Sequence, residues 1–425
     1  MGEGDAGPRP LRVLMSAYSC VPNRGSEPYV GWNWAQQAAV NHEVWVLTAS
    51  FGRAEIEAWQ RGHPNPRLHF VYHDPPRWLL WAMVRFGGLR GHYIVWQLTA
   101  PVSARRLQRA HEFDVVHHVT FNAVDVPGWL PLLGVPFVWG PVGGAQLPPP
   151  QLREYFGRRW GRERLRRLRK WLAMANLWNH YVARHASVVM AANADTEAFL
   201  RSIGAKNVRR ELETAVAVPD AEPNRRARDS SEALTLAWAG GLIPRKAPGL
   251  AIDVVEALRA RGVAARLRIA GTGELEDELR RRARDAGVAE CVEFLGALPH
   301  DAMPGFYAAA DVFLFTSLQD TSGNVVLEAM AHGLPVVALD HHGVPEMVCD
   351  DCGVRVLVGD RASVIAGFAD ALQRFAANPT LSARAGIAAR EHVRRRHGWE
   401  RKRELIDELY AVAASRTRRA NRVNS

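Results

Sequence analysis

Short apolar runs that end in small or polar residues recur along the first half of the chain. They lie at 11–19, 42–49, 68–73, 114–119, 136–140 and 187–192. Uninterrupted apolar runs of this length predict strands that are buried on both faces of a parallel sheet. The segment 32–40, between the first two runs, has the apolar spacing of an amphipathic helix. This order of strand, loop, helix and strand predicts a doubly wound α/β domain.

The same pattern starts again at residue 234. Apolar runs at 234–241, 265–273, 291–298, 311–317 and 334–340 alternate with helical segments at 247–262, 274–287, 300–310 and 323–333. The intervening stretch 219–233 is rich in proline, charge and serine, which is typical of a linker. We therefore expect two Rossmann-like domains that face each other across a cleft, where ligands bind at the C-terminal ends of the strands.

The expected division of the chain follows from these patterns. It comprises a flexible N-terminus at 1–10, an N-terminal domain at 11–218, a linker at 219–233, a C-terminal domain at 234–385, a helix at 386–415 and a basic tail at 416–425.

Composition supports a globular protein in a reducing compartment. Apolar residues make up 48% and charged residues 23% of the 425 residues, which excludes disorder as the main state. Four cysteines are too few for a disulfide scaffold. Cys349 and Cys352 have the C-x-x-C spacing of metal and redox sites, but no second pair accompanies them. We interpret this spacing as a chance pair in a loop.

Two features bear on localisation. The N-terminus lacks the apolar segment of a signal peptide, and no apolar run reaches 18 residues, so we expect a cytoplasmic protein. The segment 153–170 carries nine basic and two acidic residues with interleaved aromatic residues. A basic amphipathic helix here, over 153–172, would suit an anionic membrane surface, as a peripheral contact at the inner membrane face. The alternative is a solvated helix whose aromatic stripe packs on its own domain.

One pair of acidic residues stands out in the second half. Asp320 and Glu328 are eight residues apart, with Gly323 between them, where a loop leads into a helix. The free N–H groups of a helix N-terminus favour an anionic group such as a diphosphate. A carboxylate one turn into the helix can accept hydrogen bonds from both hydroxyls of a ribose. The alternative is that both residues only cap the helix and compensate its dipole.

The whole phrase at 311–340 resembles the acidic-x7-Glu signature of the retaining glycosyltransferases of family four, the glycosyl transferases group 1, which have the GT-B fold. The resemblance extends over residues 11–415. It includes AGGLIPRKAPG at 239–249, GSEPYVGWNWA at 25–35, DVVHHVTFNA at 114–123, PFVWGPVGGAQ at 136–146 and HGWERKRELIDELY at 397–410. It implies an acceptor-binding N-terminal domain, a C-terminal domain that binds a nucleotide sugar, and a closing helix that crosses back to the first domain.

The resemblance also assigns residues to the donor. Lys246 resembles the lysine that binds the donor diphosphate, and Asp320 stands where the family has the glutamate that holds a sugar hydroxyl. Glu328 resembles the ribose-binding glutamate. Gly241 replaces the family's usual arginine, so Arg245 would supply the second positive charge. The remaining donor-binding positions would offer backbone N–H groups or close approach: Gly271, Gly273, Gly323, Asn324 and Val325.

The acceptor or phosphate side is implied to lie in the first domain. It includes Gly25, Ser26 and Glu27 in one loop, and Gly143 and Gly144 in another. The family places a histidine near the reacting carbon, where this chain has His117 and His118; which of the two faces the donor stays open. With Lys246 and Asp320 they form the implied catalytic set.

The implied reaction moves a sugar from a nucleoside diphosphate sugar, with UDP or GDP as the expected nucleotide, to a hydroxyl acceptor. In the front-face mechanism usual for this fold, the leaving diphosphate helps to remove the acceptor proton, and no carboxylate nucleophile is required. No Asp-x-Asp motif occurs, so no metal and no other cofactor are expected. A sugar-nucleotide hydrolase or epimerase on the same fold is the alternative. A nucleic-acid-binding protein is a remote one, motivated by the net charge of +10.

Overall fold

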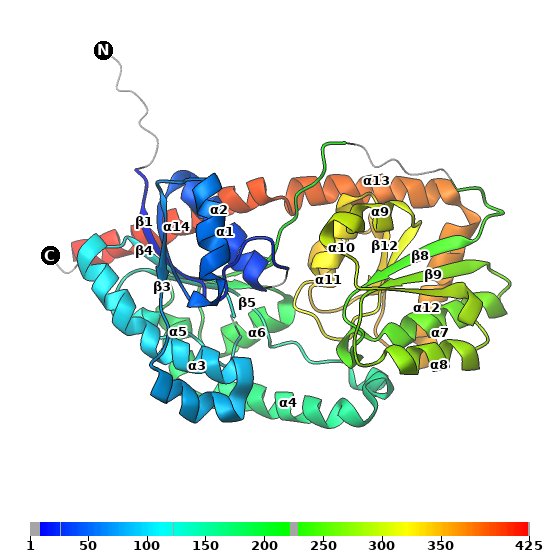
Figure 1. Ribbon diagram of the computed structural model, residues 1–425, viewed down its shortest axis with the longest axis horizontal. Helices are drawn as coiled ribbons and strands as arrows, with labels where there is room; N and C mark the ends of the chain where they lie inside the picture. The colour runs from blue at the N-terminus through cyan, green and yellow to red at the C-terminus, as the bar shows by residue number, and fades with distance from the viewer. Residues whose placement is uncertain (1–8, 26, 122, 222–227, 424–425) are drawn as a thin grey trace, which may run out of the picture. The chain divides into compact units, whose positions relative to one another are not determined.

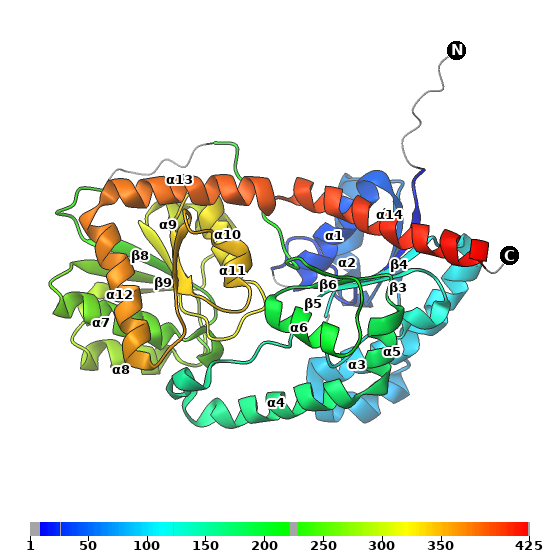
Figure 2. The same cartoon turned by 180° about the vertical axis from the view of Figure 1, so that it is seen from behind.

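The computed structural model describes residues 9–25, 27–121, 123–221 and 228–423, which form two compact units (Figures 1 and 2). Unit 1 consists of the chain up to residue 145, of 169–213, and of the chain from 399 onward; unit 2 consists of 146–168 and 214–398. The chain therefore passes between the units after residues 145, 168, 213 and 398. These passages differ from the expected boundaries, which placed 146–168 in the first domain and the passage between domains at 219–233.

Unit 1 is built on a parallel sheet of seven strands, in the order β3-β2-β1-β4-β5-β6-β7. The strands are β1 (Arg12–Ser16), β2 (Glu43–Thr48), β3 (Leu68–Tyr72), β4 (Val115–His118), β5 (Phe137–Val142), β6 (Val188–Ala191) and β7 (Val208–Arg210). Its helices are α1 (Glu27–Asn41), α2 (Arg53–Gly62), α3 (Arg77–His111), α5 (Leu177–His185), α6 (Ala194–Ser202) and α14 (Trp399–Val423). All side chains of β1 except that of Arg12 are buried, which is why its run is apolar throughout.

Unit 2 repeats this architecture with a parallel sheet of six strands, in the order β10-β9-β8-β11-β12-β13. The strands are β8 (Leu234–Ala239), β9 (Ala265–Ala270), β10 (Val292–Gly296), β11 (Val312–Phe315), β12 (Val336–Leu339) and β13 (Gly353–Val356). Its helices are α7 (Pro248–Ala260), α8 (Glu276–Asp285), α9 (Met303–Ala308), α10 (Asn324–Ala331), α11 (Val344–Met347), α12 (Arg361–Ala377) and α13 (Pro379–Arg396). Helices α7, α8 and α12 cover one face of the sheet, and α9, α10 and α13 cover the other (Figure 1).

The two parallel sheets confirm the predicted fold class, and all the predicted strands are present. The edge strands β7 and β13 were not predicted, because their sequences, VRR and GVRV, contain arginine and form no apolar run. Within the part of the chain that the structure describes, no helix has the length and apolar character needed to cross a membrane.

The closing helix α14 is fastened to unit 1 along its length. The side chain of Lys402 is almost fully buried, where its ammonium pairs with Glu211 and donates a hydrogen bond to the carbonyl of Leu212 at 2.9 Å. One turn further on, Asp407 accepts hydrogen bonds from Asn41 at 2.7 Å and contacts the imidazole of His42 at 3.0 Å. The return of this helix to the first domain is thus confirmed.

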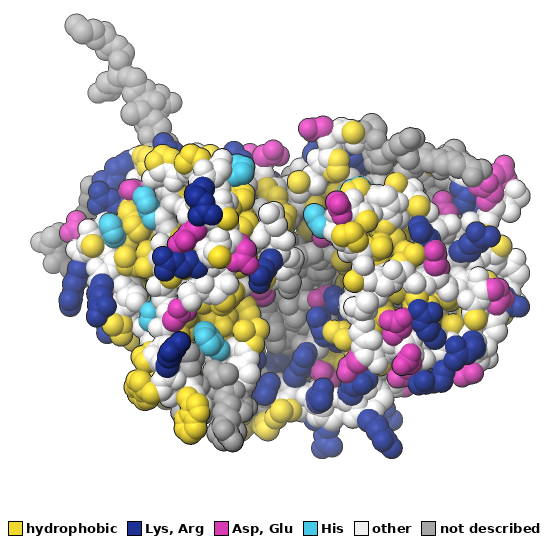
Figure 3. Space-filling model, in the orientation of Figure 1, with side chains coloured by type: hydrophobic (Ala, Val, Ile, Leu, Met, Phe, Trp, Pro, Cys, Tyr) yellow, Lys and Arg dark blue, Asp and Glu magenta, His cyan; other side chains and the backbone are white. Residues whose placement is uncertain are grey.

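The basic segment folds differently from the predicted single helix. A 3-10 helix, Pro150–Arg159, contains a kink at Gly157, and only then does α4 (Trp160–Ala175) begin. Leu152 and Phe156 lie in the core of unit 2, and Tyr155 and Trp160 pack against that core. Beyond this point the large apolar side chains are exposed, and Figure 3 shows basic side chains gathered where α4 runs in Figure 1. The aromatic residues at the start of the segment therefore pack in or against the core of unit 2, whereas Trp171, further along α4, is exposed.

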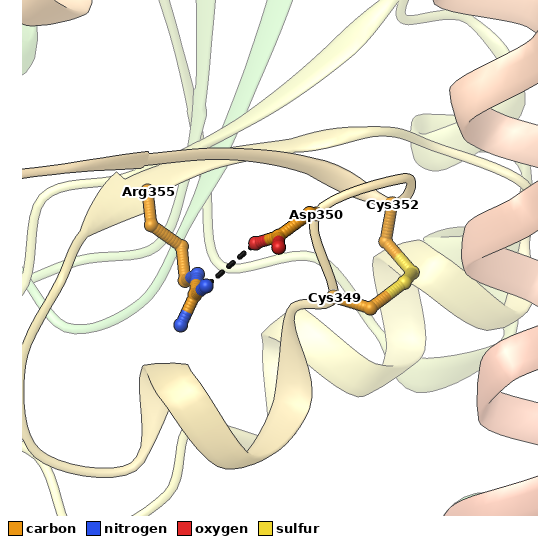
Figure 4. Close-up of a disulfide and its surroundings, with 4 residues drawn as sticks. All are labelled: Cys349, Asp350, Cys352 and Arg355. Atoms are coloured by element: carbon orange, nitrogen blue, oxygen red, sulfur yellow. Dashed lines mark hydrogen bonds and ion pairs between the residues drawn. A yellow bond between two sulfur atoms is a disulfide. The ribbon is translucent and has the colours of Figure 1, made fainter.

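Cys349 and Cys352 form a disulfide, which corrects the prediction of a chance pair (Figure 4). The bridge lies in the loop between α11 and β13, beside an ion pair between Asp350 and Arg355 at 2.6 Å. Cys20 and Cys291 are free.

One buried carboxylate, that of Asp253 on α7, helps to hold the segment 146–168 on unit 2. Asp253 accepts hydrogen bonds from the Tyr155 hydroxyl at 2.6 Å, from Arg282 at 2.5 and 2.6 Å, and from Arg361 at 3.0 and 3.2 Å. Burial and the charge of Asp253 raise the pKa of Tyr155, so its hydroxyl remains a donor. Asp253 is 3% exposed, so water does not solvate its charge, and these hydrogen-bonding partners balance it instead.

Removing this charge tests how far unit 2 depends on it. We expect Asp253→Asn to lower the free energy of unfolding by about 3 kcal/mol, because two arginines lose their shared buried carboxylate. Calorimetric melting would measure the effect, with the exposed Asp277→Asn as the matched control. Equal melting of the two variants would contradict the interpretation.

Candidate active site

The candidate site in unit 2 lies where the chain order of its sheet reverses, between β8 and β11. Loops at such a reversal part to opposite faces of a parallel sheet, which leaves room for a ligand at the C-terminal ends of the strands. Here the two loops are joined by hydrogen bonds. The carbonyl of Arg245 accepts from the backbone N–H groups of Leu318 at 2.8 Å and Gln319 at 3.2 Å, and the Thr316 hydroxyl donates to the carbonyl of Ala247 at 2.9 Å.

The joined loops bring Arg245 and Lys246 to Asp320. The Lys246 ammonium forms an ion pair with one carboxylate oxygen of Asp320, and Arg245 lies 3.4 Å from the other. Lys246 also lies over the ring of Phe315, 5.7 Å from its centroid. The predicted lysine, arginine and aspartate are therefore one cluster, in which two cations share one carboxylate. The resulting excess of positive charge favours an anionic ligand.

Glu328 lies in α10, which follows the loop of Asp320. One carboxylate oxygen accepts a hydrogen bond from the buried Tyr307 hydroxyl at 3.0 Å. Burial and the Glu328 charge raise the pKa of Tyr307 and keep this hydroxyl protonated. The other carboxylate oxygen makes no hydrogen bond within the described ranges. Tyr307 was not singled out from the sequence, because a tyrosine in a short helix carries no signal until its partner is known.

The glycines predicted to contact the donor differ in whether the fold itself requires glycine at their positions. Gly271 has a φ of +140°, and a Cβ there would collide with the backbone of Gly240. Gly273 similarly abuts the backbone of Leu242, so both are required for the loops after β8 and β9 to touch. At Gly241, in contrast, the nearest described atom to a Cβ would be 3.9 Å away, so a side chain would fit.

The start of α10 presents backbone donors. Gly323 precedes the helix with a φ of +136°, a conformation that favours glycine. Asn324 and Val325 form the first turn, where backbone N–H groups have no partner inside the helix. This turn directly follows the loop of Asp320, as predicted from the spacing.

The segment 146–168 also contributes to this site, which the sequence analysis missed. The side-chain amide of Gln146 donates a hydrogen bond to the Thr321 hydroxyl at 2.9 Å. The backbone carbonyl of Gln146 accepts one from the side-chain amide of Gln319 at 3.0 Å. The guanidinium of Arg166 donates to the side-chain oxygen of Gln319. These contacts brace the loop of Asp320 from a distant part of the chain, so no local pattern could have revealed them.

His117 and His118 end β4 in unit 1, and both are fully buried. The ring of His117 contacts the Tyr410 hydroxyl at 2.8 Å and the carbonyl of Gly140 at 2.9 Å. That of His118 contacts the Ser16 hydroxyl at 3.0 Å and the Tyr93 hydroxyl at 3.2 Å. Burial lowers the pKa of His117 to about 4 and of His118 to about 3, so both rings are neutral at pH 7.

The predicted acceptor-side residues lie in two loops of unit 1. Gly25 is exposed, Ser26 lies outside the described residues, and Glu27 accepts a hydrogen bond from the backbone N–H of Phe121 at 3.1 Å. Burial raises the pKa of Glu27. Gly143 forms a bridge with Ala123, and Gly144 follows it with a φ of +91°. All the predicted donor residues are thus in unit 2, and these residues and both histidines are in unit 1.

Family models match most of the chain. Residues 24–212 match the Glycosyl transferase 4-like domain, and residues 233–378 match the Glycosyl transferases group 1. A D-inositol 3-phosphate glycosyltransferase of Streptomyces griseus is 32% identical over 202 residues, 45% of this chain and 42% of that protein. A GDP-mannose-dependent alpha-(1-6)-phosphatidylinositol monomannoside mannosyltransferase of Mycobacterium tuberculosis is 35% identical over 111 residues, 24% of this chain and 29% of that protein. The chain thus spans less than half the length of these curated relatives.

Solved structures share the fold across nearly the whole chain. Anabaena HepE, in complex with UDP and glucose, has a TM-score of 0.60 and 19% identity, over 94% of this chain and 99% of that one. The lipopolysaccharide outer core galactosyltransferase WaaB has a TM-score of 0.64 and 13% identity, over 96% of this chain and 100% of that one. With both family models matched and this fold shared, the chain belongs to the glycosyl transferases group 1, the family-four glycosyltransferases of GT-B fold.

Proposed function

We propose that this protein transfers a sugar, with retention of configuration, from a nucleoside diphosphate sugar to a hydroxyl acceptor. The observation that carries the proposal is the cluster of Arg245, Lys246 and Asp320, whose loop leads directly into α10, the helix of Glu328. HepE, of the same fold, binds UDP and glucose, and the mycobacterial relative is GDP-mannose-dependent; UDP or GDP is accordingly the proposed nucleotide.

Arg245 and Lys246 receive the diphosphate. Negative charge grows on the leaving diphosphate as the bond to the sugar breaks, and a fixed cation stabilises that charge more than it stabilises the bound donor. Diphosphate binding replaces Asp320 as the partner of Lys246. The Asp320 carboxylate then becomes available to accept a hydrogen bond from a hydroxyl of the donor sugar.

Glu328 receives the ribose. Its carboxylate retains one oxygen outside the Tyr307 hydrogen bond, and that oxygen can accept hydrogen bonds from the ribose hydroxyls. The backbone N–H groups at the start of α10 add donors for phosphate or sugar oxygens. The leaving diphosphate takes the acceptor proton, so the reaction proceeds without a metal ion or a protein base. Glu27, Gly143 and the neutral histidines belong to the acceptor side.

Titration with nucleoside diphosphates in the presence of a chelator tests the donor site. We expect calorimetry to show binding of UDP or GDP, and Lys246→Ala and Glu328→Gln each to weaken it by about 2 kcal/mol, because each removes a charged hydrogen-bonding partner. The matched controls Lys206→Ala and Glu256→Gln alter exposed residues and should bind like the parent. Unchanged binding in both site variants would contradict the assignment.

Retention is tested on the product. Once an acceptor is found by screening, the proton coupling at the anomeric carbon should show the same configuration as the donor. In the same reaction, Lys246→Ala should lower kcat/KM by about 10²–10³, as for loss of a group that stabilises transition-state charge. An inverted product would exclude the front-face mechanism.

The exposed part of α4 supports a second component of the proposal, peripheral contact with an anionic membrane. Leu165, Leu168 and Leu172 follow helical spacing, and each is about half exposed; Trp171 is 64% exposed. Arginines such as Arg164 and Arg169 alternate with them on the same helix. Exposed tryptophan and leucine among basic residues are typical of helices that lie in the membrane interface.

Vesicle sedimentation tests this contact. We expect Arg164→Glu combined with Arg169→Glu to reduce binding to phosphatidylglycerol-containing vesicles by about tenfold or more, since each basic residue near such a surface contributes about 1 kcal/mol. The control is Arg281→Glu combined with Arg284→Glu, the same charge change on exposed positions of α8. An equal loss of vesicle binding in both double variants would show that only the net charge of the protein matters, and it would reject α4 as the contact.

A further inference from the structure

A second cluster of chemically reactive side chains lies in unit 2, away from the loops of the donor site. Cys349 and Cys352 belong to the loop between α11 and β13, and His392 projects from α13. The two sulfur atoms and one imidazole nitrogen all lie within 4.8 Å of one another. Cys352 is buried, and Cys349 and His392 are half-buried, so the group is enclosed but within reach of solvent.

Hydrogen bonding does not explain the position of His392. Its imidazole makes no hydrogen bond to any residue among those the structure describes, and its ring lies 5.3 Å from that of His397. A disulfide needs no imidazole beside it. A cluster of two thiols and one imidazole, however, is a set of soft and borderline ligands typical of zinc sites.

The spacing agrees with this chemistry. Bond lengths of about 2.3 Å to sulfur and about 2.0 Å to nitrogen place the ligand atoms of a tetrahedral zinc site about 3.5–3.8 Å apart. The Cα atoms of Cys349 and Cys352 are 5.0 Å apart, and C-x-x-C is a common zinc-binding spacing.

We propose that the reduced protein binds Zn²⁺ through the thiolates of Cys349 and Cys352 and the imidazole of His392, with water as the fourth ligand. A dithiol reductant opens the disulfide by passing two electrons and two protons to the sulfur atoms and becoming a disulfide itself. Zn²⁺ then displaces the two thiol protons, and the two thiolate charges balance that of the ion.

The two states fasten different parts of unit 2. The disulfide joins two residues of one loop, three positions apart, and leaves α13 unattached to it. Zinc ligated by His392 links that loop, and with it the edge strand β13, to α13. Zinc binding would therefore stabilise unit 2 against melting, by an amount that grows with the logarithm of the zinc concentration once this exceeds the dissociation constant.

Metal binding is measured on the full chain after reduction by a dithiol and its removal without air. We expect one equivalent of Zn²⁺ per reduced chain, no stoichiometric binding to the oxidised chain, and a higher melting temperature of the reduced chain with zinc. Co²⁺ in place of Zn²⁺ should give the thiolate charge-transfer and visible d–d absorption of a tetrahedral site.

The ligand variants Cys349→Ser and His392→Gln should each weaken Zn²⁺ binding by at least tenfold. The matched controls are Cys291→Ser, another half-buried cysteine of unit 2, and His300→Gln, an exposed histidine of the same unit. In the absence of metal, all four reduced variants should melt like the reduced parent. Lack of stoichiometric zinc in the reduced chain, equal binding by the oxidised chain, or undiminished binding by His392→Gln would overturn the proposal.

Discussion

The candidate donor site of this protein depends on hydrogen bonds between two loops that follow neighbouring strands of one parallel sheet. The carbonyls of Arg245, Lys246 and Ala247 accept hydrogen bonds from the loop after β11. A buried carbonyl left without a partner costs about 1–3 kcal/mol, so the two loops are held to one arrangement. Lys246 and Asp320 project from these loops, and their pairing follows from the backbone contacts beneath them.

Thr316 has a central place in this arrangement. Its hydroxyl accepts a hydrogen bond from the Trp238 indole at 3.0 Å and donates to the carbonyls of Lys246 and Ala247. The tryptophan is part of β8 and lies in the core of unit 2. The loop of Arg245 and Lys246 is thus positioned by hydrogen bonds that lead to a side chain packed in the core of unit 2.

Unit 2 is also not formed by one continuous stretch of chain. The segment 146–168 supplies Leu152 and Phe156 to its core, Tyr155 to the carboxylate of Asp253, and Gln146 and Arg166 to the loop of Asp320. A segment that precedes the second sheet by some seventy residues in the printed sequence therefore completes both the core and the donor loop. Substitutions in this segment therefore act on unit 2, although in the sequence the segment directly follows the loop of Gly143 and Gly144, which belongs to unit 1.

The amino-acid sequence by itself determined the two parallel sheets, because strands buried on both faces must be apolar throughout. Its motifs, through their resemblance to the family, also singled out Arg245, Lys246, Asp320 and Glu328, the residues of the proposed donor site. Only the tertiary structure decided that Gln146, Arg166 and Tyr307 support that site, that Cys349 is bonded to Cys352, and that both histidines of β4 have buried partners. These contacts join residues from separate elements or depend on exact side-chain placement, and local patterning carries no information about which polar groups meet when the elements pack.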